Sequence, residues 1–204
     1  MSFIKNVFIN CPFDNTYRPL LNALAFELVY LNFEPKLSQT LSSSAIRINQ
    51  IKELIKSCKF SIHDISRSKP LSANELPRFN MPYELGLDIG ALEYGSGKLK
   101  YKKILILETE KYHYQKVLSD IAGQDIENHN DDPKIVILKV RNWISANFSG
   151  LIIPGQSEIW KAFNQFNADL AIKLNATYNL KEIENMPIGD YIKFSKVWIA
   201  SFKN

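Results

Sequence analysis

The feature that most constrains the fold of this chain is the alternation of short apolar runs with longer segments of helical periodicity. Residues 5–11 (KNVFINC) and 103–108 (KILILE) are apolar runs rich in β-branched residues, which is typical of buried strands. Four strands are expected, at residues 5–11, 34–38, 59–65 and 103–108. Apolar residues three or four apart predict helices at residues 17–31, 46–58, 82–94 and 134–148. Because parallel strands need crossover connections, this alternation predicts an α/β protein with a parallel sheet and helices on both of its faces.

The C-terminal part of the chain has a different character. Two segments here have apolar residues spaced three or four apart, as in a helix. Each follows a pair of helix-breaking residues, Pro154 and Gly155 for the first and Pro187 and Gly189 for the second. We expect helices here, packed on the sheet domain or on a second subunit. The chain is therefore predicted to contain an α/β domain at residues 1–150 and a C-terminal helical extension at residues 151–204.

Composition disfavours several classes of protein. Of the 204 residues 46% are hydrophobic, yet no apolar run approaches the roughly 18 to 20 residues of a membrane span. The start of the chain lacks the pattern of a signal peptide, and the two cysteines do not suggest a disulfide framework. The net charge of +4 is too small and dispersed for a nucleic-acid footprint, and the basic stretch 98–103 is expected to be a solvated turn. We therefore expect a cytoplasmic protein with neither a membrane nor a nucleic-acid partner.

Familiar ligand motifs are missing from the sequence. Neither G-x-G-x-x-G after the first strand nor G-x-x-x-x-G-K-[ST] occurs, which disfavours a dinucleotide-binding dehydrogenase and a P-loop NTPase. His63, His113 and His129 have no metal-ligand spacing, so no metal site is expected, and His129 is expected at the surface. Cys11 lacks the glycine cradle of a phosphatase loop and is expected to be a small buried residue that closes the first strand.

We expect chemistry at the carboxyl ends of the strands, where open α/β sheets bind ligands. Glu84 stands out in the segment FNMPYELG (79–86), because Pro82 is a natural first helical residue and places Glu84 in the first turn. A carboxylate there could stabilise a sugar oxocarbenium ion or attack its anomeric carbon. The simpler explanation is a helix-start residue that interacts favourably with the helix dipole. Gly86 and Gly90 are expected to let this helix lie close to the sheet.

Several stretches of the chain carry a resemblance to a known family. They are residues 8–14 (FINCPFD), 61–67 (SIHDISR), 77–86 (PRFNMPYELG), 84–108 (ELGLDIGALEYGSGKLKYKKILILE) and 118–126 (LSDIAGQDI). Over roughly residues 5–148 the chain resembles a bacterial group of TIR-like domains associated with antiphage defence, and it is similar to nucleoside deoxyribosyltransferases. The tryptophan–cysteine pair that commonly precedes the glutamate of plant and animal TIR domains is absent, and Pro82 and Tyr83 occupy the adjacent places.

The resemblance implies a flavodoxin-like three-layer fold and a glutamate that acts at an N-glycosidic bond, since catalytic TIR domains cleave the nicotinamide–ribose bond of NAD. It implies Glu84 as nucleophile or oxocarbenium stabiliser, with Asp64 as its catalytic partner. Asp14 and Asp64 would bind ribose hydroxyls, while aromatic rings would stack on nicotinamide or adenine and arginines would hold the pyrophosphate. The expected substrate-binding residues are Phe13, Asp14, Tyr17, Arg47, Arg67, Arg78, Phe79, Asn80 and Tyr83.

Simpler roles remain open for these binding residues. Asp14 could form an Asx turn, Tyr17 could cover the first helix, and the three arginines could face solvent.

Three functions are open at this point. In the first, the chain is an NAD glycohydrolase or cyclase that gives linear or cyclic ADP-ribose, with NAD as substrate and no cofactor. It would act in bacterial antiviral defence as a homo-oligomer, with a defence-system effector protein as a possible partner. In the second, the chain hydrolyses or transfers a free nucleoside or nucleotide. In the third, it is a non-catalytic nucleotide-sensing or assembly module, in which Glu84 only starts a helix.

Overall fold

The computed structural model describes residues 3–40, 46–70, 72, 74–149, 152–175 and 177–202. The chain divides into two compact units. The first, here called the sheet unit, consists of Met1–Phe13 and Glu34–Asp132, and the second, the helical unit, consists of Asp14–Phe33 and Pro133–Asn204. The chain thus leaves the sheet unit after its first strand, forms one helix of the helical unit and returns. The predicted domain boundary near residue 150 stays a prediction.

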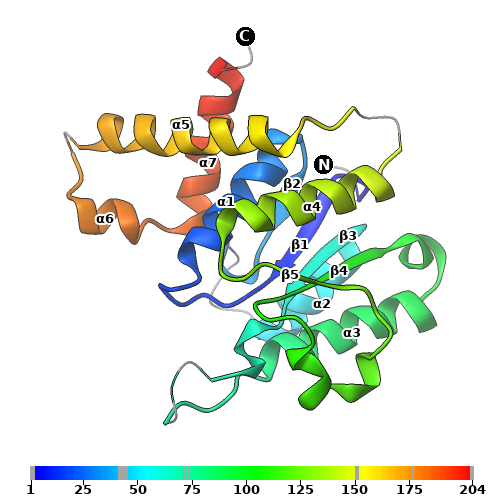
Figure 1. The fold of residues 1–204 in the computed structure, drawn as a ribbon. Coiled ribbons are helices and arrows are strands. Elements are labelled where there is room, and N and C mark those ends of the chain that lie inside the picture. The colour runs from blue at the N-terminus through cyan, green and yellow to red at the C-terminus, as the bar shows by residue number, and fades with distance from the viewer. Residues whose placement is uncertain are drawn as a thin grey trace. The chain divides into compact units, whose positions relative to one another are not determined.

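Five parallel strands in the order β2-β1-β3-β4-β5 form the sheet (Figure 1). The strands are β1 (Asn6–Asn10), β2 (Glu34–Lys36), β3 (Phe60–Asp64), β4 (Lys103–Glu108) and β5 (Ile126–Asn128). This is the strand order of flavodoxin-like sheets, so the predicted α/β class with a parallel sheet is confirmed. Every residue of β1 and β3 is buried, which explains why their sequences carry so little polar alternation.

The strand β5 corrects the sequence prediction of four strands. It has only three residues and pairs with the end of β4, with Ile126 opposite Ile106 and Asn128 opposite Glu108. A three-residue strand is too short to show a period of two in the sequence. Its pairing is instead favoured by the open edge of β4, whose backbone groups need hydrogen-bond partners.

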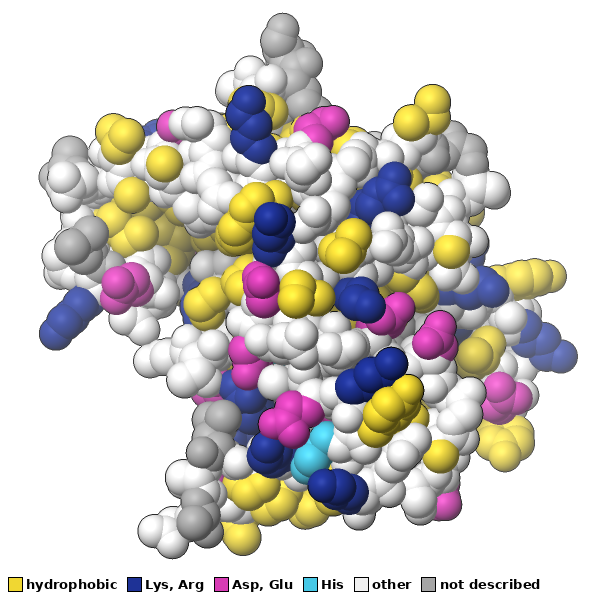
Figure 2. Space-filling model, in the orientation of Figure 1, with side chains coloured by type: hydrophobic (Ala, Val, Ile, Leu, Met, Phe, Trp, Pro, Cys, Tyr) yellow, Lys and Arg dark blue, Asp and Glu magenta, His cyan; other side chains and the backbone are white. Residues whose placement is uncertain are grey.

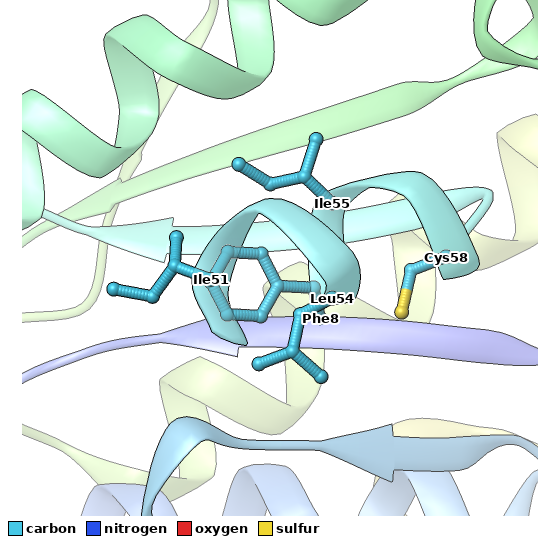
Figure 3. Packing of buried hydrophobic residues seen from close by; sticks show 5 residues of the cluster. All are labelled: Phe8, Ile51, Leu54, Ile55 and Cys58. Atoms are coloured by element: carbon cyan, nitrogen blue, oxygen red, sulfur yellow. The ribbon is translucent and has the colours of Figure 1, made fainter. Parts of the chain in front are cut away.

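Two helices, α2 (Arg47–Ser57) and α3 (Asn80–Tyr94), pack on one face of the sheet. Figure 3 shows the side chains of α2 that pack with Phe8 of β1, and the buried cluster consists of Phe8, Ile51, Leu54, Ile55 and Cys58. Full burial of a large apolar side chain contributes roughly 1.5–3 kcal/mol, so this cluster holds α2 firmly. The expectation that Gly86 and Gly90 bring α3 close to the sheet is wrong, because a Cβ at either position would meet nothing within 4 Å.

The helical unit is built around α1 (Arg18–Tyr30), which contacts α4 (Pro133–Asn147), α5 (Gln156–Leu174) and α7 (Ile188–Phe202). Ten of the 13 residues of α1 are buried, as expected for a helix that is apolar on most sides. The Phe26 ring lies 5.2 Å from that of Phe166 and 5.6 Å from that of Phe163.

A short helix that the sequence prediction lacks, α6 (Leu180–Glu184), begins with a capping box. In this box the Asn179 side chain accepts from the Glu182 amide, and the Glu182 side chain accepts from the Asn179 amide. None of the helices in the described residues is both long and apolar enough to span a bilayer. Basic and acidic side chains are interspersed on the face shown in Figure 2.

Candidate functional site

The start of α3 places Glu84 differently from the sequence prediction. The helix begins at Asn80, before Pro82, and its first turn holds no acidic residue. The N-cap residue Phe79 makes no side-chain capping hydrogen bond. The explanation of Glu84 as a helix-start residue is therefore wrong, and another reason is needed for a carboxylate at this position.

The carboxyl group of Glu84 is almost completely buried, with 4% of the residue exposed. Its Oε1 lies 3.9 Å from Nη2 of Arg47, the first residue of α2, whose side chain is mostly exposed. Burial raises the pKa of Glu84, and the Arg47 charge offsets this effect only in part. The site thus combines a desolvated carboxyl group with one solvent-reaching cation.

A hydrogen bond from the end of β1 holds the first turn of α3. The side-chain nitrogen Nδ2 of Asn10 donates to the carbonyl oxygen of Met81 at 3.0 Å and to Nδ1 of His63 at 2.9 Å. Asn10 and His63 are register partners on β1 and β3, so their side chains lie side by side. Because the Met81 carbonyl can only accept, the Asn10 atom must be the amide nitrogen, and His63 Nδ1 must accept the second hydrogen bond.

This assignment places the ring proton of His63 on Nε2, which donates to Oδ2 of Asp88 at 3.0 Å. The other oxygen of Asp88 lies 3.1 Å from Nζ of Lys102. Although burial raises the pKa of Asp88, the His63 hydrogen bond and the Lys102 charge outweigh that effect and lower it. His63, Asp88 and Lys102 are all inaccessible to solvent.

Lys102 corrects the expectation that the whole stretch 98–103 is a solvated turn. In addition to the ion pair with Asp88, its ammonium group donates to the carbonyl oxygens of Ile55 at 3.0 Å and Cys58 at 2.7 Å, and to Oγ of Ser61 at 3.2 Å. A buried ammonium group needs such partners to compensate for lost hydration. The sequence alone gives no sign that this one lysine of the stretch turns inward.

The buried network positions Glu84 through α3. Asp88 follows Glu84 by four residues, so the two side chains lie on the same face of the helix. Asn10 holds the first turn at Met81, while His63 and Lys102 hold the next turn at Asp88. The sequence analysis did not predict any of these four residues as part of a site. The signal that could have found them is a polar side chain inside an otherwise apolar strand, or on the apolar face of a helix.

Asp64 does not contact Glu84. His63 faces α3, and because successive strand residues point to opposite faces, the neighbouring Asp64 points away from that helix. Its Oδ1 accepts from the Ser66 amide at 2.9 Å, and its Oδ2 lies 2.9 Å from Nε2 of His129. Burial raises the pKa of Asp64, but the interactions with His129 and the hydrogen bonds from Ser66 together outweigh that effect and lower it.

His129 is fully buried, so the expectation of a surface residue is wrong. Its Nδ1 accepts from the Asp131 amide at 3.1 Å, and its Nε2 faces both Asp64 and, at 3.1 Å, Oγ of Ser66. In a catalytic triad the acid and the nucleophile use different ring nitrogens. In this structure Asp64 and Ser66 both face Nε2 of His129. The His129 side chain therefore connects the segment after β5 to the end of β3 and does not activate Ser66.

The remaining predicted residues of the sheet unit are spread over several segments. Phe79, Asn80 and Tyr83 are exposed around the start of α3, in the same segment as Glu84. Phe13 is half-buried after β1. Arg67 is buried, so solvent exposure is the wrong expectation for it.

Arg78 lies half-buried in the loop before α3. Its Nη2 donates to Oε1 of Glu75 at 3.2 Å.

Asp14 and Tyr17 belong to the helical unit and are described there alone. Oδ1 of Asp14 accepts from Oγ1 of Thr16 at 2.6 Å and from the Tyr17 amide at 3.0 Å, which forms the Asx turn considered as its simpler role. Tyr17 is buried at the start of α1. Cys11 is also buried, as predicted.

The chain was compared with models of known protein families, with curated proteins and with solved structures, and none of them matches it. Within the described residues, no group of three or more His, Cys, Asp or Glu side chains is arranged to hold a metal ion.

Proposed function

We propose that the chain is a TIR-like enzyme that cleaves the N-glycosidic bond between nicotinamide and ribose in NAD. The product is linear or cyclic ADP-ribose, and the setting is bacterial antiviral defence signalling in the cytoplasm. The observation that carries the proposal is the carboxyl group of Glu84, which is buried, is not needed to start its helix, and lies on a helix that a buried network holds at Met81 and Asp88.

The proposed reaction uses Glu84 as an ionised group. When the bond breaks, its electron pair moves to the pyridine nitrogen, and nicotinamide leaves as a neutral molecule without needing a proton. The positive charge passes to the ribose ring as an oxocarbenium ion, which the Glu84 carboxylate stabilises or attacks. Water then gives linear ADP-ribose with release of a proton, whereas attack by a nitrogen of the adenine gives a cyclic product.

The surroundings of Glu84 supply suitable binding groups for such a substrate. Arg47 lies 3.9 Å from the carboxylate and has a mostly exposed guanidinium group, which suits a pyrophosphate. Phe79 and Tyr83 are about 60% exposed, so their rings are free to stack on a nicotinamide or adenine ring. Asn80 and Arg78 are the further substrate contacts proposed in this segment, and Arg67, Asp64 and Phe13 stay predictions from the resemblance, as do Asp14 and Tyr17.

The test is mass spectrometry of NAD incubated with this protein at high concentration, since assembly into a homo-oligomer is part of the proposal. Glu84→Gln should keep its fold and lose turnover by roughly 10²- to 10³-fold, as expected when a group that stabilises transition-state charge is removed. Glu93→Gln, an exposed glutamate of the same helix, is the matched control and should retain full turnover. Unchanged NAD consumption by Glu84→Gln would refute the proposal.

The pH dependence gives a second readout. Because the pKa of Glu84 is raised by burial and the ionised form is required, turnover should fall on the acid side at a higher pH than an ordinary glutamate would cause.

Parallel reactions with nucleoside monophosphates separate the alternatives. Cleavage of these and not of NAD would favour a nucleotide glycosidase, and binding without any product would favour a sensing or assembly module.

A further inference from the structure

A separate cleft lies at the carboxyl ends of β3, β4 and β5 in the sheet unit. It has a volume of about 210 Å³ and is lined by Ser66 and Arg67 after β3, by Glu108 and Thr109 at the end of β4, and by Asp131 after β5. Glu84 does not line it. Ligands of open α/β sheets bind at this edge, so the cleft occupies a place where the fold favours recognition.

Glu108 is the residue that points to a ligand. It lines the cleft although only 2% of it is exposed, and neither carboxylate oxygen makes a hydrogen bond of normal geometry to a described residue. The nearest basic group is Nδ1 of His113, 3.3 Å from Oε1. Burial raises the pKa of Glu108, and the Tyr114 amide and His113 offset this only in part. Buried carboxylate oxygens normally accept hydrogen bonds, so Glu108 is suited to accept them from a bound molecule.

Backbone geometry around the cleft supports this interpretation. Four described non-glycine residues adopt positive φ angles, and three of them are in this region: Tyr112 at 67°, Asn130 at 53° and Asp131 at 55°. Tyr112 directly precedes His113, and Asp131 lines the cleft. Left-handed conformations are unfavourable for a residue such as tyrosine and are found preferentially where function requires them.

Charge and size restrict the kind of ligand. The charged lining is balanced, with three basic and three acidic side chains: Arg67, Lys69, His113, Glu108, Glu110 and Asp131. Lys69 and Glu110 already pair with each other, with Nζ 2.6 Å from Oε1. Such a lining gives no strong preference for an anion. At about 30 Å³ per water molecule, the volume equals that of about seven waters, which is enough for one sugar ring.

We propose that this cleft binds a neutral polyhydroxylated ring of pentose size, with Glu108 accepting hydrogen bonds from its hydroxyl groups. The Thr109 hydroxyl group, which donates to Oδ1 of Asp131 at 3.3 Å, can accept a further hydrogen bond from the ring hydroxyl groups. The proposal is independent of the reaction assigned to Glu84.

Saturation-transfer NMR with D-ribose as the probe tests this site on the full chain. For a ligand of this size we expect a dissociation constant of about 1–10 mM with the unmodified protein. Glu108→Gln replaces one acceptor oxygen by a donor and should weaken ribose binding at least about tenfold. Thr109→Val should also weaken it, while the exposed-residue control Glu93→Gln should bind ribose as the unmodified protein does.

Three results would overturn the proposal: no transfer to ribose, ribose binding unchanged in both cleft variants, or binding of inorganic phosphate in place of ribose. Circular dichroism checks the fold of each variant. If Glu108→Gln does not fold, Thr109→Val decides the outcome, because it removes one hydroxyl group from a partly exposed position and keeps the side-chain shape.

Discussion

Lys102 and Asp88 form a fully buried ion pair in the sheet unit, and the position of Glu84 depends on it. Removing one partner of such a pair leaves an uncompensated charge, which typically costs about 3–5 kcal/mol. A hydrophobic pair would give similar stability, so stability alone does not account for these residues. Their hydrogen bonds to Ser61 and His63 instead define one orientation of α3 on the sheet, which a purely apolar contact would leave less well determined.

In the helical unit, the protonation of Glu27 should make the free energy of unfolding depend on pH. This residue is fully buried in α1, and neither of its oxygens has a hydrogen-bond partner among the described residues. Burial raises the pKa of Glu27 well above its usual value, and the Arg141 charge lowers it only in part. Above a pH of about 4.3 the unfolded chain loses this proton while the folded chain keeps it, so stability falls as the pH rises.

We therefore predict that Glu27→Gln removes this pH dependence. Relative to the variant, the free energy of unfolding of the unmodified protein should fall by up to about 1.4 kcal/mol per pH unit above a pH of about 4.3. Urea unfolding across the range from mildly acidic to neutral pH measures the difference. The exposed Glu184→Gln is the control and should follow the unmodified protein. Parallel curves for Glu27→Gln and the unmodified protein would show that Glu27 is ionised in the folded state.

At the scale of elements, replacing a glycine by alanine should have opposite effects on stability inside α3 and directly after it. Gly86 is an exposed residue inside the helix where an added Cβ would meet no atom within 4 Å, whereas a Cβ on Gly95 would overlap the Ala91 carbonyl oxygen. Gly86→Ala should raise the free energy of unfolding by about 0.5–1 kcal/mol, because alanine has the higher helix propensity. Gly95→Ala should lower it, and chemical denaturation of the two variants side by side measures both. Destabilisation by Gly86→Ala would mean that α3 needs a glycine there.

The long elements follow from the sequence, and the short ones do not. Three predicted strands agree with the structure to within about two residues at each end: 5–11 with β1, 59–65 with β3 and 103–108 with β4. Two predicted helices agree equally well: 17–31 with α1 and 46–58 with α2. These segments are long enough for a clear period, or are continuous apolar runs. The strand β5 and the helix α6 span three and five residues and are selected by an open strand edge and by a capping box.

At the scale of the whole molecule, the structure bears on whether residues 1–150 form a domain by themselves. The helix α1 belongs to the helical unit, where the Phe26 ring lies 5.6 Å from Phe163, 5.2 Å from Phe166 and 6.1 Å from Trp198. All three of these partners follow residue 150. A chain that ends there would lose much of the apolar surface that buries α1.

We predict that the truncated chain 1–150 unfolds with less cooperativity and binds a hydrophobic dye such as ANS, and that adding a peptide of residues 155–204 reverses both effects. Thermal unfolding followed by circular dichroism is the measurement. Ile152→Ser in the full chain is the control, because that side chain is 99% exposed and its loss should change neither property. A truncated chain that unfolds as cooperatively as the full one would establish 1–150 as an independent domain.

The sequence by itself determined the class of fold, because apolar periodicity and strand–helix alternation are local properties that leave few arrangements open. It also singled out Glu84. The tertiary structure decided what holds the helix that carries this carboxylate: Asn10, His63, Asp88 and Lys102 come from four different segments, and nothing local marks them as partners. It likewise separated Asp64 from Glu84 by the face of the sheet and placed Glu108 in a cleft of its own. Burial and hydrogen bonding between distant segments depend on the packed structure, and a single sequence does not reveal them.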